Sequence, residues 1–256
     1  MIARFPEARS CAYAPDGIVL GHGGAPASDP CFVEGLFSVQ DEASQLVLEL
    51  LAPAPGERIL DTCAAPGTKT AAIAERVGPS GLVVALDRSA PRLALVGRSA
   101  RRLGLDNVTA LARDATQPLA DLPGAPFDRI LVDAPCSGLG TLRRDPDLKW
   151  SRTELDLPRL AAEAGRMLSH AASAVRPGGL LVYATCSSEP EENEAVVSAF
   201  LGAHPEFVVE RPAPAAGVLR PERVIGADAY LRTLPFRDGL DAFFAAALRR
   251  RSPAGL

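Results

Sequence analysis

The alternation of short apolar segments with segments of helical periodicity constrains the fold of this chain most strongly. Strands separated by helices form parallel sheets with helices on both faces. The sequence therefore predicts an α/β fold with a doubly wound, mostly parallel seven-stranded sheet and an antiparallel C-terminal hairpin. The expected strands lie at 57–61, 82–86, 108–112, 129–133 and 179–184, with the hairpin strands near 230–234 and 243–248 around Arg237-Asp-Gly239.

Helix ends and domain limits follow from capping residues and prolines. Ser38-Val-Gln-Asp41 resembles a capping box, so a helix is expected after Ser38 and before Pro53. Ser188, with Glu191 three residues on, is expected to open a helix at 189–203. The main domain is expected at 38–256, while residues 1–37 are too few for a core of their own and read as a collar. The other helices are expected at 70–77, 90–103 and within 153–175.

Composition excludes several classes of protein. With 256 residues, 47% hydrophobic and 23% charged, the chain is expected to be globular, and no run approaches the length of a membrane span. Its net charge of -4 means that any site for a polyanion must be local. Five cysteines without paired spacing indicate reduced thiols in a cytoplasm rather than disulfides or a metal site. His22 is expected to be a loop residue, and the protein a monomer without metal.

A glycine-containing turn follows the first strand of the main domain, in Asp61-Thr-Cys-Ala-Ala-Pro-Gly67-Thr-Lys-Thr70. It lacks both the dinucleotide fingerprint and the phosphate-loop motif. Asp87, Asp114 and Asp133 end the next strands, where each could be a helix cap or a ligand contact. In open α/β sheets ligands bind at these strand ends. A nucleoside cofactor without a pyrophosphate fits this pattern, which points to S-adenosylmethionine.

Two cysteines follow two expected neighbouring strands. Cys136 stands in Asp133-Ala-Pro-Cys-Ser-Gly138, and Cys186 in Ala184-Thr-Cys-Ser187. Each could be a small buried residue at a strand end. Together, beside a methyl donor, they indicate covalent chemistry, because a thiolate that adds to carbon 6 of a pyrimidine makes carbon 5 nucleophilic. The residues alone do not decide which thiol attacks.

These motifs resemble those of the Sun/Fmu-type (RsmB-like) RNA cytosine-5 methyltransferases from about residue 31 onward. Arg143-Arg-Asp-Pro-Asp-Leu-Lys-Trp150 and Asp241-Ala-Phe-Phe244 are also similar to family patterns. The resemblance implies a Rossmann-like class I methyltransferase in which Cys186 is the nucleophile and Cys136 helps to free the product. Asp133 would contact both the cytosine and the cofactor, and Lys69 would face the base. The implied cofactor-binding residues are Cys63, Ala64, Ala65, Pro66, Gly67, Thr68, Lys69, Asp87, Asp114 and Asp133.

The chain departs from the family pattern in ways that matter for function. Thr68 stands where the family usually has glycine, and a branched residue there would be costly if the position needs a positive φ. Residues 1–37 resemble only the last part of the RNA-binding module that usually precedes the catalytic domain. RNA contacts are therefore expected from Arg143, Arg144, Lys149 and Trp150, unless the arginines are solvated loop charges and Trp150 is core.

The resulting hypothesis is methyl transfer from S-adenosylmethionine to carbon 5 of a cytosine in RNA, with ribosomal RNA favoured over transfer RNA. The alternative is a non-catalytic, cofactor-binding scaffold for RNA biogenesis or a truncated paralogue. The sequence identifies neither the target cytosine nor the source of RNA affinity.

Overall fold

An eight-stranded sheet forms the centre of the computed structural model, which describes residues 7–21, 25–211 and 218–252. His22 lies outside the described residues. The strand order is β5-β4-β3-β6-β7-β10-β8, and β9 also pairs with β10. The strands are β3 (Arg58–Asp61), β4 (Leu82–Asp87), β5 (Val108–Ala112), β6 (Phe127–Asp133), β7 (Val175–Thr185), β8 (Phe207–Val209), β9 (Leu231–Thr233) and β10 (Phe243–Arg250), while β1 (Arg9–Ser10) and β2 (Ile18–Val19) form a separate pair.

The topology reverses direction between β3 and β6. From β3 the chain proceeds through β4 to β5 on one side, and from β6 to β7 on the other, with all these neighbours parallel. This confirms the predicted doubly wound, mostly parallel sheet. The antiparallel pairing of β10 with β7 and β9 confirms the C-terminal antiparallel edge. β8 was not expected, and the turn between β9 and β10 contains the short helix α9 (Pro235–Asp238) rather than a tight hairpin turn.

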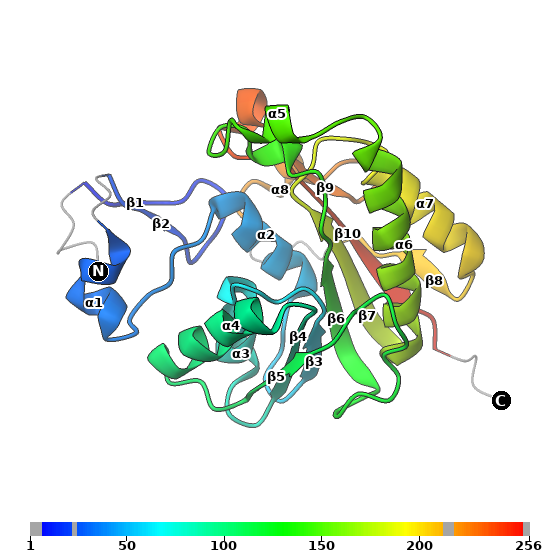
Figure 1. The fold of residues 1–256 in the computed structure, drawn as a ribbon, viewed down its shortest axis with the longest axis horizontal. Helices are drawn as coiled ribbons and strands as arrows, with labels where there is room; N and C mark the ends of the chain where they lie inside the picture. The colour runs from blue at the N-terminus through cyan, green and yellow to red at the C-terminus, as the bar shows by residue number, and fades with distance from the viewer. Residues whose placement is uncertain (1–6, 22–24, 212–217, 253–256) are drawn as a thin grey trace.

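Helices cover both faces of the sheet (Figure 1). Alternate residues of each strand point to opposite faces, so Ile130 and Val132 of β6 join one hydrophobic cluster and Leu131 joins the other. α6 and α7 pack on the first face, whereas α2 and α3 pack on the second. The helices are α1 (Pro30–Val33), α2 (Glu42–Leu51), α3 (Thr68–Val77), α4 (Ala90–Arg102), α5 (Leu148–Ser151), α6 (Asp156–Ala174), α7 (Glu194–Ala203), α8 (Pro221–Val224) and α9, with 3-10 turns η2 (Pro26–Ser28) and η3 (Leu139–Thr141).

Two predicted helix starts are wrong. α2 begins at Glu42 because the Asp41 carboxylate, not the Ser38 hydroxyl, accepts the hydrogen bond from the backbone N–H of Ala43. α7 begins at Glu194 instead of Glu189. The Ser188 hydroxyl bonds Glu189 and caps no helix. Residues 189–193 instead form turns, from which the Glu192 side chain reaches another loop.

The described part of residues 1–37 packs on the main domain. Tyr13 is buried in the same hydrophobic cluster as α2, and its backbone N–H donates to Glu42 over 2.6 Å. Arg102, at the end of α4, donates to the carbonyl oxygens of Phe32 and Phe37 and lies over the Phe32 ring. The segment therefore shares the core of the main domain instead of forming one of its own.

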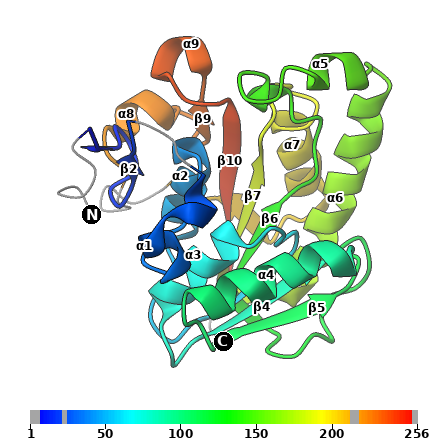
Figure 2. The same ribbon diagram turned by 60° about the vertical axis from the view of Figure 1, so that its left-hand side comes forward.

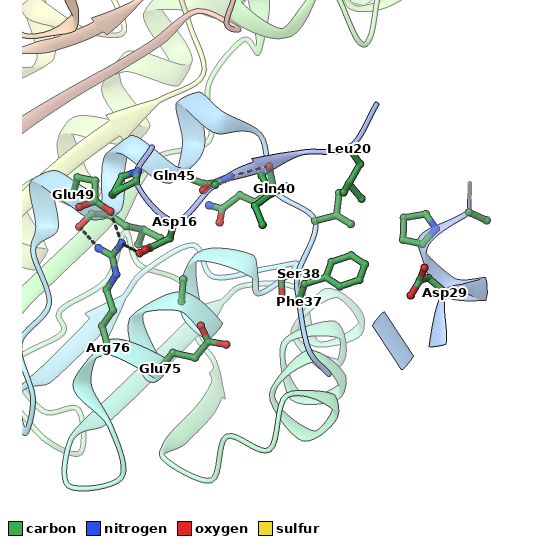
Figure 3. A pocket seen from close by; sticks show the side chains of 18 of the residues that line it. Asp16, Leu20, Asp29, Phe37, Ser38, Gln40, Gln45, Glu49, Glu75 and Arg76 are labelled. Carbon is green, nitrogen blue, oxygen red and sulfur yellow. Dashed lines mark hydrogen bonds and ion pairs between the residues drawn. The ribbon is translucent and has the colours of Figure 1, made fainter. Parts of the chain in front are cut away.

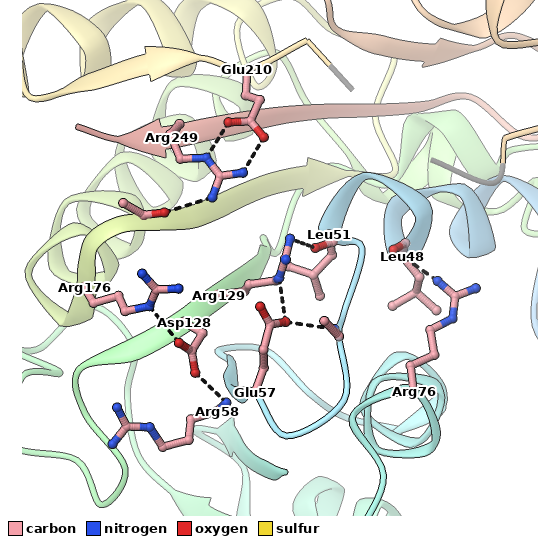
Figure 4. A network of polar contacts seen from close by, with 12 residues as sticks. Leu48, Leu51, Glu57, Arg58, Arg76, Asp128, Arg129, Arg176, Glu210 and Arg249 are labelled. Carbon is pink, nitrogen blue, oxygen red and sulfur yellow. Dashed lines mark hydrogen bonds and ion pairs between the residues drawn. The ribbon is translucent and has the colours of Figure 1, made fainter. Parts of the chain in front are cut away.

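Ion pairs connect the strands at the edge of the sheet where the parallel strands begin (Figure 4). Arg129 of β6 donates to Glu57 over 2.6 Å, and Arg176 of β7 donates to Asp128 over 2.7 Å. Arg249, near the end of the antiparallel β10, pairs with Glu210. These contacts hold the ends of β3, β6, β7 and β10 together and leave the opposite edge of the sheet to the loops that follow Asp61, Asp133 and Thr185.

Arg143 and Arg144 both pair with Asp241 and are therefore not isolated loop charges. The Asp241 side chain is fully buried, and its Oδ1 lies 3.0 Å from Arg143, while Oδ2 pairs with Arg144. Arg143 also donates to the carbonyl oxygen of Gly239. Both arginines are half-exposed. The pairs therefore connect the loop after Cys136 to the segment that leads into β10.

This arrangement predicts an asymmetric effect on stability. Replacing both Arg143 and Arg144 by alanine leaves the Asp241 carboxylate buried without its cations, which should cost about 3–5 kcal/mol. Asp241→Asn should cost less, because the half-exposed arginines can return to water. Urea unfolding of the two variants measures the difference. A larger loss for Asp241→Asn would contradict the assignment of these arginines as structural.

Candidate functional site

A cavity of about 270 Å³ lies at the carboxyl ends of the parallel strands, where the topology reverses between β3 and β6. Ligands of doubly wound sheets bind at this crevice. Of the predicted site residues, the cavity is lined by Cys63, Ala65, Asp87, Asp114, Asp133, Cys136 and Cys186. Its other lining residues, which the sequence analysis missed, are Thr62, Arg88, Arg92, Ala115, Ala134, Pro135 and Met167.

The glycine-containing turn between β3 and α3 forms one wall of this cavity. Gly67 has φ of 109°, and a Cβ on it would lie 2.9 Å from the Cα of Val96 in α4, so only glycine suits the turn. Thr68 is already the first residue of α3 and does not have a positive φ. The threonine at this position therefore causes no backbone strain. The predicted residues of the turn that do not line the cavity are Ala64, Pro66, Gly67, Thr68 and Lys69.

Two carboxylates lie on the cavity wall at the ends of β4 and β5. Asp87 accepts a hydrogen bond from the backbone N–H of Ser89, and its second oxygen lies 3.8 Å from Arg92. Asp114 accepts from both the backbone N–H and the hydroxyl of Thr116, which lowers the pKa of the Asp114 carboxyl. The short polar turns after the strands thus fix the orientation of both side chains.

The two predicted thiols lie side by side. β6 and β7 are parallel, with Asp133 opposite Ala184, so Cys136 and Cys186 follow neighbouring strand ends. Their Sγ atoms are 3.4 Å apart, and both residues are free thiols. The hydrogen bond with Cys136 lowers the pKa of the Cys186 thiol, although burial opposes this effect. The same contact raises the pKa of Cys136, and burial raises it further. The contact thus shifts the two pKa values in opposite directions.

Lys69 and Asp133 form an ion pair beside these thiols. The Lys69 Nζ atom lies 2.7 Å from Asp133 Oδ2. Burial alone would lower the pKa of Lys69, but the charge and hydrogen bond of Asp133 raise it above its ordinary value. The Lys69 charge lowers the pKa of Cys186, whereas the Asp133 carboxylate raises it more strongly. The side chains of Lys69, Asp133 and Cys186 thus form one electrostatic unit.

A buried polar network, which the sequence analysis missed, joins the two cysteine loops. Glu192 accepts hydrogen bonds from the backbone N–H and the hydroxyl of Ser137, over 2.7 and 2.6 Å. The Ser137 hydroxyl lies 3.3 Å from that of Ser187, and Asn193 donates to the Ser187 carbonyl oxygen. The residues after Cys136 and after Cys186 are therefore fixed to each other. The sequence did not indicate this network, because its pattern predicted that residues 189–193 belong to a helix.

Gly140 permits a third loop to approach these two. Its backbone N–H donates to the Cys186 carbonyl oxygen, and its own carbonyl oxygen accepts from the N–H of Ala242. A Cβ on Gly140 would lie 2.1 Å from the Ala242 oxygen and 2.7 Å from that of Cys186. Only glycine allows this packing, which places the segment before β10 against the cysteine loops.

Asp61, at the end of β3, is a second buried carboxylate that the sequence analysis did not assign. Its Oδ2 accepts a hydrogen bond from Thr70 over 2.7 Å, whereas Oδ1 has no hydrogen-bond partner among the described residues. Burial raises the pKa of Asp61 to about 6, against the opposing effect of the Thr70 hydrogen bond. Thr62 and Cys63, which follow directly, line the cavity.

A larger cavity of about 720 Å³ lies between the N-terminal segment and helices α2 and α3 (Figure 3). Arg76 bonds Glu49 and Asp16 on its wall. None of the predicted site residues lines it, and it shares no lining residue with the strand-end cavity. Within the described ranges, no cluster of three or more side chains is suited to hold a metal ion, and no helix has the length and apolar character to span a membrane.

Comparison with known proteins agrees with this geometry. Residues 48–249 match the family of the 16S rRNA methyltransferase RsmB/F. The chain is 42% identical over 247 residues to ribosomal RNA small subunit methyltransferase B of Pseudomonas syringae pv. tomato, covering 94% of this chain and 53% of that protein. It is 44% identical over 222 residues to the protein of that name from Vibrio cholerae, covering 87% and 48%.

A solved structure of NSun6 from Pyrococcus horikoshii with SFG superposes with a TM-score of 0.75 at 31% identity, covering 89% of this chain and 56% of that one. A methyltransferase homolog protein from Pyrococcus horikoshii gives a TM-score of 0.78 at 30% identity, covering 95% and 78%. The chain spans about half the length of the curated relatives that it matches. By sequence and by fold, the chain belongs to the 16S rRNA methyltransferase RsmB/F family.

Proposed function

We propose that this protein transfers a methyl group from S-adenosyl-L-methionine to carbon 5 of a cytosine in the RNA of the small ribosomal subunit. The observation that carries the proposal is the contact of Cys136 and Cys186, 3.4 Å apart, on the wall of the strand-end cavity. Family membership and the names of the relatives support the RNA substrate. We further propose that residues 1–37 are the last part of an N-terminal RNA-binding module or a collar on the main domain.

The cavity residues fit this cofactor, which when bound supplies an electrophilic methyl group. Asp87 ends the strand after the glycine-containing turn, where an acidic side chain can accept hydrogen bonds from ribose hydroxyls. Asp61 directly precedes Thr62 and Cys63 of the cavity wall, and its buried Oδ1 has no hydrogen bond within the described residues. A buried acceptor of this kind is costly, so a ligand group is a natural partner for it.

Cys186 is assigned as the nucleophile. Its thiolate adds to carbon 6 of the cytosine, and the electron pair displaced in the ring makes carbon 5 able to take the methyl group. The hydrogen bond with Cys136 lowers the pKa of Cys186 and favours the thiolate, and the Lys69 charge partly offsets the opposing charge of Asp133. Asp133, fixed by Lys69, hydrogen-bonds the edge of the base. The base has to be unpaired or flipped out, because the thiolate approaches from above the ring plane.

Cys136 is assigned to product release. After methyl transfer, carbon 5 carries both a proton and the new methyl group. A base removes the proton, and the Cys186–carbon bond breaks with its electron pair returning to sulfur. Cys136 is next to Cys186 and therefore adjoins the bond that must break.

Single cysteine replacements separate these two roles. Cys136→Ala should form a covalent protein–RNA adduct that accumulates, whereas Cys186→Ala should form none and should not methylate. Cys31→Ala in α1 serves as the control and should methylate like the wild type. Denaturing electrophoresis with labelled RNA measures the adduct. An adduct that persists in Cys186→Ala would reverse the assignment, and cellular function retained without Cys186 would favour the non-catalytic scaffold.

Glu192 should affect catalysis through the positions of the thiols. In Glu192→Gln an amide nitrogen replaces one of the two oxygens that accept from Ser137, so the loops should separate and kcat should fall by about 100-fold. The matched control is Ser188→Ala, which removes an exposed hydroxyl beside the same loop. Cofactor affinity, measured by calorimetry, should be unchanged in both variants. Equal kcat values for the two would contradict this role.

Replacing Asp61 by asparagine should raise stability and weaken cofactor binding. Its pKa in the folded state is about 6, above the ordinary 3.8, so its ionisation disfavours folding. This loss of folding free energy is absent below about pH 4 and complete above about pH 7. A pKa raised by about 2 corresponds to about 3 kcal/mol. Asp61→Asn should therefore unfold at higher urea concentration than the wild type at pH 8, with little difference at pH 4.

The same Asp61→Asn variant should bind S-adenosylmethionine more weakly, because the acceptor changes. Calorimetric titration at pH 8 tests this part. A variant that is both less stable at pH 8 and unchanged in cofactor affinity would contradict the assigned role of Asp61.

A further inference from the structure

The side chain of Trp150, in α5, is 80% exposed to solvent although it is the only tryptophan of the chain. Large aromatic side chains usually contribute their area to a core or an interface. The expectation that Trp150 could be a core residue is therefore wrong. Because the ring does not pack in the core, its exposure needs a different explanation.

Trp150 has a fixed position relative to the cysteine loop. Arg152 donates from Nε to the carbonyl oxygen of Ser137 over 2.8 Å, directly after Cys136. Leu148 packs on Gly138, since a Cβ added there would lie 3.3 Å from a Leu148 methyl carbon. Contacts on both sides of Trp150 thus hold α5 on the loop that carries Cys136. The exposed ring is consequently carried by a short helix that contacts the loop of the proposed active site.

Lys149 covers one face of this ring. Its Nζ atom lies 4.5 Å from the Trp150 ring centroid, in a cation–π contact. The exposure of the tryptophan leaves area for a second planar group. The ammonium group would then also be close to a negatively charged group attached to that planar ligand.

A second exposed aromatic ring, Phe236, belongs to α9 and is 87% exposed. α9 is connected to the loop after Cys136 through the hydrogen bond from Arg143 to Gly239. Figures 1 and 2 both place α5 and α9 at the same end of the molecule. The two segments that carry these rings are therefore both bonded to the loop after Cys136.

We propose that Trp150 and Phe236 are stacking platforms for unpaired nucleobases that flank the target cytosine, with Lys149 beside a phosphate. The proposal rests on the proposed function, because an extruded cytosine leaves its neighbours without stacking partners. Aromatic side chains with adjacent cations bind single-stranded RNA in this manner. A protein partner would instead need a contiguous apolar patch, whereas Trp150 is flanked by Lys149 and Ser151.

The single tryptophan gives a direct test on the unaltered protein. A cytosine-containing single-stranded oligoribonucleotide is titrated while its binding is followed by anisotropy of a label on the RNA and by Trp150 fluorescence. Stacking should quench the fluorescence in parallel with binding. RNA that binds and is methylated without quenching would overturn the stacking proposal alone. A protein that neither binds nor methylates the oligonucleotide would overturn the proposed function as well.

Variants give the energetic counterpart. Trp150→Ala and Phe236→Ala should each weaken RNA binding and raise KM by about 5- to 150-fold, the range for one stacked base, with kcat unchanged. Trp150→Phe should restore most of the affinity. Leu155→Ala is the matched control, because Leu155, directly before α6, is 84% exposed and carries no ring; it should bind like the wild type. Equal losses for Leu155→Ala and Trp150→Ala would contradict stacking.

Discussion

The parallel pairing of β6 with β7 is the constraint on which the candidate site depends. Its register sets Asp133 opposite Ala184, so that the segments carrying Cys136 and Cys186 leave the sheet side by side. Register alone does not bring two sulfur atoms to 3.4 Å. The Glu192 network fixes the loops to each other, and Gly140 lets the segment before β10 close over them. Strand pairing thus places the two cysteine segments side by side, and the buried loop contacts bring the two sulfur atoms into contact.

The site also contains groups that disfavour folding. Asp61 is buried with a raised pKa, and Asp241 is a fully buried carboxylate that needs two arginines. Glu192 is buried among hydroxyl and amide groups that satisfy it. Burying a charged group costs desolvation free energy even when the group is paired, so these groups are retained where they position something else. In this chain, each lies beside the cavity or beside a loop that borders it.

The sequence predicted most of the sheet, because strand signals of apolar runs ending at Asp61, Asp87 and Asp133 are local. It also predicted that the two thiols lie close together, because the expected topology places both cysteines at the ends of neighbouring strands. It failed where long-range contacts decide. Asp41 rather than Ser38 caps α2, and Glu192 leaves the expected helix because Ser137 binds it. The pairing of Arg143 and Arg144 with Asp241, about one hundred residues away, has no local signal.

The central claim is that Cys186, and not Cys136, attacks the base. RNA that carries 5-fluorocytidine tests it in the wild-type protein, because fluorine replaces the proton that must leave carbon 5, and the adduct therefore cannot be released. Mass spectrometry of the digested adduct identifies the modified cysteine. The account predicts that the RNA is attached to the peptide containing Cys186. Attachment at Cys136, or no attachment in the presence of S-adenosylmethionine, would contradict it.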